Sequence, residues 1–131
     1  MSEATQKKFR KFVRELGRLL REEADKGLVT PDAKDQDSTP PWKSAFIDVR
    51  WFADAEGWSA KIRAALPNNT RRGLRINRDM NNIVIKISTL RKEDPSVEWY
   101  GLKVCVTPNG EVTTELNNDP NCVIDPTWFK S

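Results

Sequence analysis

The stretch from Val97 to Asp119 carries carboxylates along one face of a predicted hairpin. Apolar and polar residues alternate on both sides of a Thr-Pro-Asn-Gly turn, a pattern typical of two antiparallel strands. Glu111 and Glu115 fall on the same face of the second strand, because side chains alternate along a strand. Such carboxylates serve either acid–base chemistry of the glycosidase type or the binding of a basic partner.

The composition argues against most other catalytic chemistry. The chain of 131 residues has no histidine, so a serine or cysteine nucleophile would lack an imidazole base. Its two cysteines are too few for a disulfide framework, and a zinc site would need ligands that the sequence does not cluster. We expect two free thiols, with Cys105 packed and the role of Cys122 left open. We therefore expect no enzyme, no metal and no cofactor.

The hairpin and its ends supply the first candidate site, a partner-binding surface. Carboxylates on a rigid sheet beside aromatic residues suit a basic protein surface such as a nuclease active site. The alternative is a solvated sheet face that binds nothing. The candidate residues are Glu98, Trp99, Tyr100, Glu111, Glu115 and Asp119.

Charge is segregated along the chain behind a net charge of +3. Residues 58–92 hold nine Lys and Arg against one acid, whereas residues 93–131 hold two against seven. Opposed patches steer encounter with a charged protein or with nucleic acid. The basic segment 61–78 therefore gives the second candidate, a nucleic-acid-binding site, although no known nucleic-acid-binding motif accompanies it. Its residues are Arg71, Arg72, Arg75 and Arg78.

The first element that positions these residues is an N-terminal helix from Ser2 to Gly27. Ser2 is a capping residue and Gly27 a stop signal. The opposite face is basic, but Glu residues at helical spacing, such as Glu22 after Arg18, indicate a solvated face rather than a phosphate-binding one. The helix is predicted from apolar residues at three- and four-residue spacing, namely Phe9, Phe12, Val13, Leu16, Leu19, Leu20 and Ala24.

Residues 44–52 and 58–66 alternate as a strand pair joined by a short loop that contains Gly57. Residues 79–91 fit both a strand and a helix, and we predict a helix capped by Asn77 or Asp79. Residues 28–42, rich in Pro and Asp, are predicted to be an exposed connecting loop. The whole chain, 1–131, then forms a single α+β domain, with an antiparallel sheet of about four strands packed against two helices.

No apolar run approaches the roughly 20 residues of a membrane-spanning helix, and the first residues lack the apolar core of a secretory signal. We expect a cytoplasmic protein that does not bind membranes.

The hairpin resembles that of small bacterial toxin immunity proteins of the YezG-like group. Members share a helix, a tryptophan before a strand, an Asn-Gly or Asp-Gly turn, and a second strand that ends at an acidic corner. Trp99, Asn109, Gly110 and Asp119 match that pattern. The resemblance implies an α+β immunity protein that neutralises a cognate toxin of a contact-dependent growth inhibition or other polymorphic toxin system.

Our leading hypothesis is therefore stoichiometric inhibition of a protein toxin, a nuclease being the class we expect. The charged sheet face would occupy the toxin's active-site cleft, with the four acidic candidates as charge complements and Trp99 or Tyr100 as an apolar anchor. The alternative is a nucleic-acid-binding module that uses segment 61–78.

Overall fold

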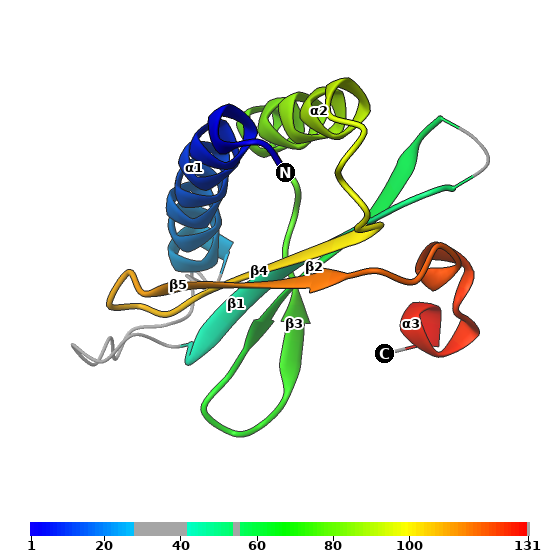
Figure 1. Ribbon diagram of the computed structural model, residues 1–131. Coiled ribbons are helices and arrows are strands. Elements are labelled where there is room, and N and C mark those ends of the chain that lie inside the picture. The colour runs from blue at the N-terminus through cyan, green and yellow to red at the C-terminus, as the bar shows by residue number, and fades with distance from the viewer. Residues whose placement is uncertain (28–41, 54–55, 131) are drawn as a thin grey trace.

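A computed structural model describes residues 1–27, 42–53 and 56–130 (Figure 1). The predicted loop over residues 28–42 lies outside the described residues except for Trp42. The prediction is wrong for Trp42, which is 2% exposed and donates its indole N–H to Asp25 at 2.9 Å. This tryptophan packs in the core and joins the end of the first helix to the start of the sheet.

The predicted α+β fold is confirmed, with five strands instead of about four. All paired strands are antiparallel, in the order β3-β2-β1-β4-β5. The additional strand, β3, is only three residues long and lacks the apolar alternation that predicts a strand. The elements are α1 (Glu3–Gly27), β1 (Ser44–Trp51), β2 (Trp58–Ala65), β3 (Arg71–Gly73), α2 (Arg78–Glu93), β4 (Gly101–Val106), β5 (Val112–Asn117), the 3-10 helix η1 (Cys122–Ile124) and α3 (Pro126–Lys130).

Helix α1 forms as its apolar spacing predicts. The Ser2 hydroxyl accepts a hydrogen bond from the Thr5 backbone N–H at 3.2 Å, so the predicted N-cap is confirmed. Leu16 and Leu20 are fully buried against the sheet and α2. On the exposed face Arg18 bonds to acidic side chains one turn away on both sides, which fits the predicted solvated face.

Helix α2 resolves the ambiguous stretch in favour of the predicted helix. Asn77 caps it, because its side-chain oxygen accepts from the Met80 N–H at 2.9 Å. A strand would have put Ile83 and Ile85 on one face, but in the helix Ile85 is 47% exposed. The buried face consists of Met80, Ile83, Val84, Ile87 and Leu90.

Both long helices cover the same face of the sheet (Figure 1). Ile47 of β1 lies between Ile62 of β2 and Val104 of β4, and this row packs beneath the helices. The intervening residues of each strand point to the opposite side, because side chains alternate. We call that opposite side the open face.

The C-terminal segment, for which the sequence predicted no structure, covers one end of the open face. In Figure 1, η1 and α3 lie on the side of the sheet away from α1 and α2. Trp128 of α3 is 6% exposed and packs against β1, where the Arg50 guanidinium carbon lies 4.6 Å from its ring centroid. The rest of the open face carries no helix in the described part of the chain.

Candidate protein-binding surface

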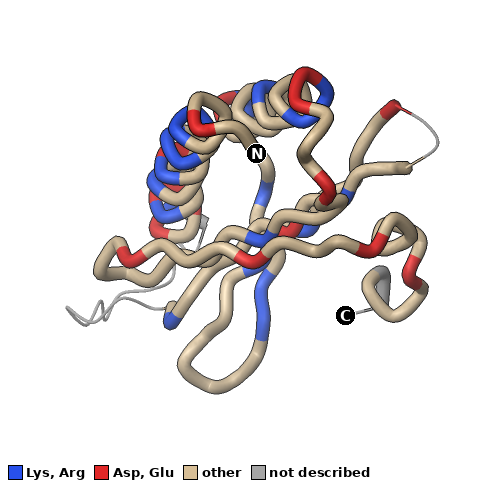
Figure 2. The backbone as a smooth tube through the Cα atoms, in the orientation of Figure 1, with Lys and Arg blue, Asp and Glu red and all other residues tan. Residues whose placement is uncertain are grey.

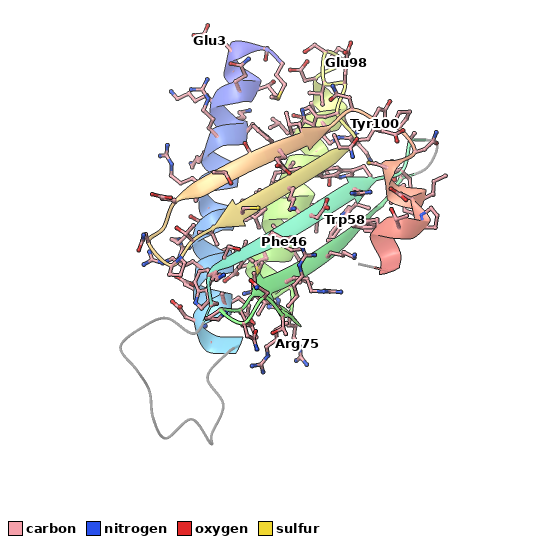
Figure 3. All side chains as sticks on the ribbon, turned by 90° about the horizontal axis from the view of Figure 1, so that it is seen from below. Glu3, Phe46, Trp58, Arg75, Glu98 and Tyr100 are labelled. Carbon is pink, nitrogen blue, oxygen red and sulfur yellow. The ribbon has the colours of Figure 1, made fainter. Side chains whose placement is uncertain are left out.

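The centre of the open face is an aromatic ring held between two cations. Phe46 of β1 is half-buried, with Lys103 Nζ 4.7 Å and the Arg71 guanidinium carbon 5.6 Å from its ring centroid. These residues come from three strands, β1, β4 and β3, and Figure 3 looks onto the face that they share. The cations lie over an apolar ring and form no ion pair with the described residues, an arrangement that leaves them able to bind anionic groups.

An acidic edge is defined here as Glu115 of β5 together with Glu111 and Asp119, which come just before and just after that strand. The strand register confirms that Glu115 points to the open face, since it lies opposite Lys103. Glu111 comes directly before β5, in the turn where the Thr107 N–H donates to its carbonyl at 3.0 Å. Both glutamates are exposed. Figure 2 shows acidic positions on β5 and on the segments before and after it, at the border of the sheet.

The structure does not gather the six predicted partner-binding residues into one surface. Trp99 is 5% exposed and packs in the core, with ring centroids 5.4 Å from Phe9 and 5.5 Å from Trp51, so it is not a surface anchor. Glu98 is exposed in the connection between α2 and β4, outside the sheet. Tyr100 is half-buried beside Arg91 rather than beside the acidic edge.

Arg63 of β2 and Arg71 of β3 form a basic edge, which lies at the opposite side of the open face from the acidic edge. Arg71 pairs with Ala65 on the open face, whereas Arg72 pairs with the core-facing Ala64 and so points to the opposite side. The other two predicted arginines do not lie on the sheet: Arg75 is exposed in the connection after β3, and Arg78 begins α2. Figure 3 labels Arg75 beyond the β3 end of the open face.

At the covered end of the open face, Trp128 and the 3-10 helix η1 hold several charged side chains in place. Arg50 donates to the Cys122 carbonyl at 2.6 Å and lies 3.5 Å from the Asp48 carboxylate. Lys61 is 9% exposed, and burial, followed by repulsion from Arg63, lowers its pKa. These groups stabilise the fold and are not free for a partner.

The two cysteines are free thiols, as predicted. Burial raises the pKa of both thiols, which disfavours thiolate chemistry at neutral pH. Cys122 is 2% exposed and donates to the Tyr100 carbonyl at 3.6 Å, so its role is structural.

The described residues offer neither a metal-binding cluster nor a membrane-spanning helix. Residues 1–27, 42–53 and 56–130 contain no group of three or more acidic or cysteine side chains that could hold a metal ion. None of the helices in these same ranges is long and apolar enough to cross a membrane.

Sequence reasoning missed one polar residue with unusual surroundings, Arg91 of α2. Its guanidinium carbon lies within 5.5 Å of the ring centroids of Trp51, Trp99 and Tyr100. No sequence pattern marks it, because the rings come from separate segments that only the fold brings together.

Neither a protein-family model nor a curated protein matches the chain.

Proposed function

We propose that this protein is a non-enzymatic inhibitor that neutralises a bacterial protein toxin by stoichiometric binding through the open face. The observation that supports the proposal is the distribution of charge on that face. Glu111 and Glu115 line one side, while Arg63 and Arg71 line the other, around the half-buried Phe46. A rigid face with opposed charges orients a protein partner that carries the complementary pattern.

The mixed charge favours a protein over nucleic acid. A phosphate backbone is uniformly negative and would meet the carboxylates of the acidic edge on part of the open face. A protein toxin can present basic residues to Glu115 and acidic residues to Arg71 in one interface. Lys103 and Phe46 then take the anchoring role that the sequence analysis assigned to Trp99 or Tyr100.

The sheet alone is too small for a stable protein interface, so residues outside it must also contact the partner. Strands about 4.8 Å apart with about 3.4 Å per residue give a face of roughly 20 by 25 Å, or about 500 Å². A stable interface buries about 800 Å² on each partner. Binding therefore extends beyond the strands, and exposed Asp119 and Arg75 lie where the additional contacts would form.

The nucleic-acid-binding alternative rests on Arg71, Arg72, Arg75 and Arg78, which are all exposed. Direct titration with tRNA and with duplex DNA at about 150 mM salt separates the two functions, because phosphate binding weakens steeply with salt. The proposal predicts no saturable binding under these conditions. Submicromolar binding that Arg71→Glu and Arg72→Glu abolish would favour the alternative.

A growth assay tests the proposal itself. The protein is produced, in the cytoplasm where we place it, together with the candidate toxin encoded beside its gene. We expect wild-type protein to restore growth, and the pair to co-purify at one-to-one stoichiometry. Growth restored without a stable complex would contradict inhibition by binding.

A further inference from the structure

A concave site lies between α2 and the adjoining ends of β1 and β2, apart from the open face. The cavity has a volume of about 550 Å³. That lies within the range of roughly 300–1,000 Å³ found for small-molecule sites. Trp51, Trp58 and Tyr100 contribute aromatic walls, and Ser88 and Arg91 contribute polar groups.

The polar centre of this cavity is the Arg91 guanidinium. Nε and Nη2 both donate to the Trp99 carbonyl oxygen, at 3.2 and 2.9 Å. This leaves the Nη1 hydrogens and one Nη2 hydrogen without an acceptor among the described residues. One Nη1 hydrogen and the remaining Nη2 hydrogen lie side by side on the free edge of the planar group, an edge that can bind a carboxylate through two parallel hydrogen bonds.

Arg91 has no acidic partner within the described ranges. The only carboxylate that lines the cavity there is Glu56, which is paired with the neighbouring Lys92 at 2.8 Å. Burial lowers the pKa of the Arg91 guanidinium, but arginine remains protonated in proteins. A half-buried cation that lacks a counter-ion is destabilising, and an anion bound beside it would offset that cost.

The rim of the cavity is apolar and exposed. Phe52 is 41% exposed and Ile85 is 47% exposed, and they are two of the four large apolar side chains exposed in the described residues. Trp58, which also lines the cavity, is half-buried. Exposed apolar groups gathered around a depression are typical of a binding site rather than of ordinary surface.

The floor is fixed by hydrogen bonds before any ligand binds. The Trp51 indole N–H donates to the Ser88 hydroxyl at 2.7 Å, and that hydroxyl donates to the Val84 carbonyl at 2.8 Å. Trp51 is 3% exposed, so its ring cannot turn away without disturbing the core. The cavity is therefore largely preformed.

We propose that this cavity binds a small planar organic acid. Its carboxylate accepts hydrogen bonds from the free side of the Arg91 guanidinium, and its apolar body packs against Trp58, Phe52 and Ile85. This site is independent of toxin binding at the open face, so the two proposals stand or fall separately.

The test uses 2-naphthoate as the probe, with 2-naphthamide as its neutral counterpart and inorganic phosphate as an anion without an apolar body. Binding is followed by NMR on ¹⁵N-labelled protein through the indole N–H signals of Trp51 and Trp58. We expect saturable shifts of these two signals, and affinity for the acid about tenfold or more above that for the amide, since the charge-assisted bonds are lost in the amide.

Two substitutions distinguish a specific role of Arg91 from the effect of positive charge in general. Arg91→Ala is expected to reduce affinity for 2-naphthoate by about tenfold or more, whereas Lys86→Ala, which removes the same charge from an exposed position on α2, changes it by less than about twofold. Ile85→Glu keeps the helix intact and places a negative charge at the rim. It should therefore weaken binding of 2-naphthoate but not binding of 2-naphthamide. Ile85→Gln is its neutral control, and thermal melts establish that each variant is folded.

Three results would overturn the proposal. The first is equal affinity for the acid and the amide, and the second is binding of phosphate as tight as that of 2-naphthoate. The third is no saturable shift of the Trp51 and Trp58 signals by 2-naphthoate, while folded Arg91→Ala weakens binding to the toxin. In that case the cavity receives a side chain of the protein partner and is not a small-molecule site.

Discussion

The indole N–H of Trp128 donates a hydrogen bond to the Asp48 carboxylate at 3.1 Å, although 80 residues separate the two in sequence. The contact attaches the C-terminal segment to the middle strand of the sheet. The same ring lies over Arg50 and within 5.6 Å of Lys61 Nζ, so it covers the charges at one end of the open face. The C-terminal segment thereby limits the part of the face that a partner can reach.

Removing this cover should destabilise the protein. Trp128→Ala is expected to lower the free energy of unfolding by about 3 kcal/mol, because a large buried ring and a hydrogen bond to a carboxylate are lost together. Urea unfolding followed by circular dichroism measures the change. Ile124→Ala is the matched control, since Ile124 lies in the same segment but is 60% exposed, and it should change stability by less than about 0.5 kcal/mol. Equal effects of the two variants would show that Trp128 does not hold the segment.

The β4–β5 turn depends on Gly110. Its φ is +89°, a left-handed conformation that favours glycine, and an added Cβ would lie 3.1 Å from Arg21 Nη1. Gly110→Val should therefore lower the free energy of unfolding by about 2 kcal/mol, because a β-branched residue is strained at positive φ. Gly73→Ala is the control, since its Cβ would meet only Arg63 Nη1 at 3.9 Å. An unchanged unfolding midpoint for Gly110→Val would contradict a turn that depends on Gly110.

Helix α1 approaches β5 closely at Gly17. A Cβ at this position would lie 2.7 Å from a Val112 methyl group, a distance at which the helix or the strand must move. Gly17→Ala should therefore destabilise the protein, although Ala is favoured over Gly by about 1 kcal/mol in a helix interior. In the Gly17→Ala background, the further change Val112→Ala should remove the clash, so that the stability gained from the higher helix propensity of Ala becomes measurable. A double-mutant cycle without coupling between the two positions would contradict this packing.

The start of α1 and the end of α2 are joined by Asp94. Hydrogen bonds from the Ser96 hydroxyl at 2.6 Å and from the Ser2 and Ser96 N–H groups hold the pKa of this carboxyl well below its usual range. Its stabilising contribution is therefore complete at neutral pH and is lost progressively as pH falls below about 4, the value for Asp in the unfolded chain.

Melting temperatures measured from pH 7 to pH 2 test the role of Asp94. We expect Asp94→Asn to melt at a lower temperature than wild type at pH 7 and to lose less stability on acidification. Glu98→Gln, which removes a charge from an exposed side chain nearby, should keep the wild-type pH dependence. Parallel curves for wild type and Asp94→Asn would contradict the assignment.

Local periodicity was sufficient to predict most of the secondary structure. The apolar spacing of α1 and α2 predicted both helices, and the alternation in β4 and β5 placed Glu115 on the open face of the sheet. These patterns indicate which side of a helix or strand is buried, because each pattern depends only on residues that are close together in the sequence.

The positions of the tryptophans could not be predicted in the same way. Trp99 follows a loop and looks like a surface residue, but Phe9 and Trp51 enclose it in the core. Trp128 belongs to a five-residue helix whose contacts lie on β1. β3 likewise depends on pairing with β2 rather than on its own residues. In each case the deciding contacts come from distant segments, so the candidate site was only partly predictable.

Calorimetric titration of the candidate toxin with charge-reversed variants tests the central proposal most directly. One variant combines Glu111→Lys with Glu115→Lys, a second combines Arg63→Glu with Arg71→Glu, and a control combines Lys7→Glu with Lys11→Glu on the exposed side of α1. If the open face binds the toxin, each sheet variant loses about tenfold to a hundredfold in affinity while the control stays within about threefold of wild type. Wild-type affinity in both folded sheet variants would contradict binding through the open face.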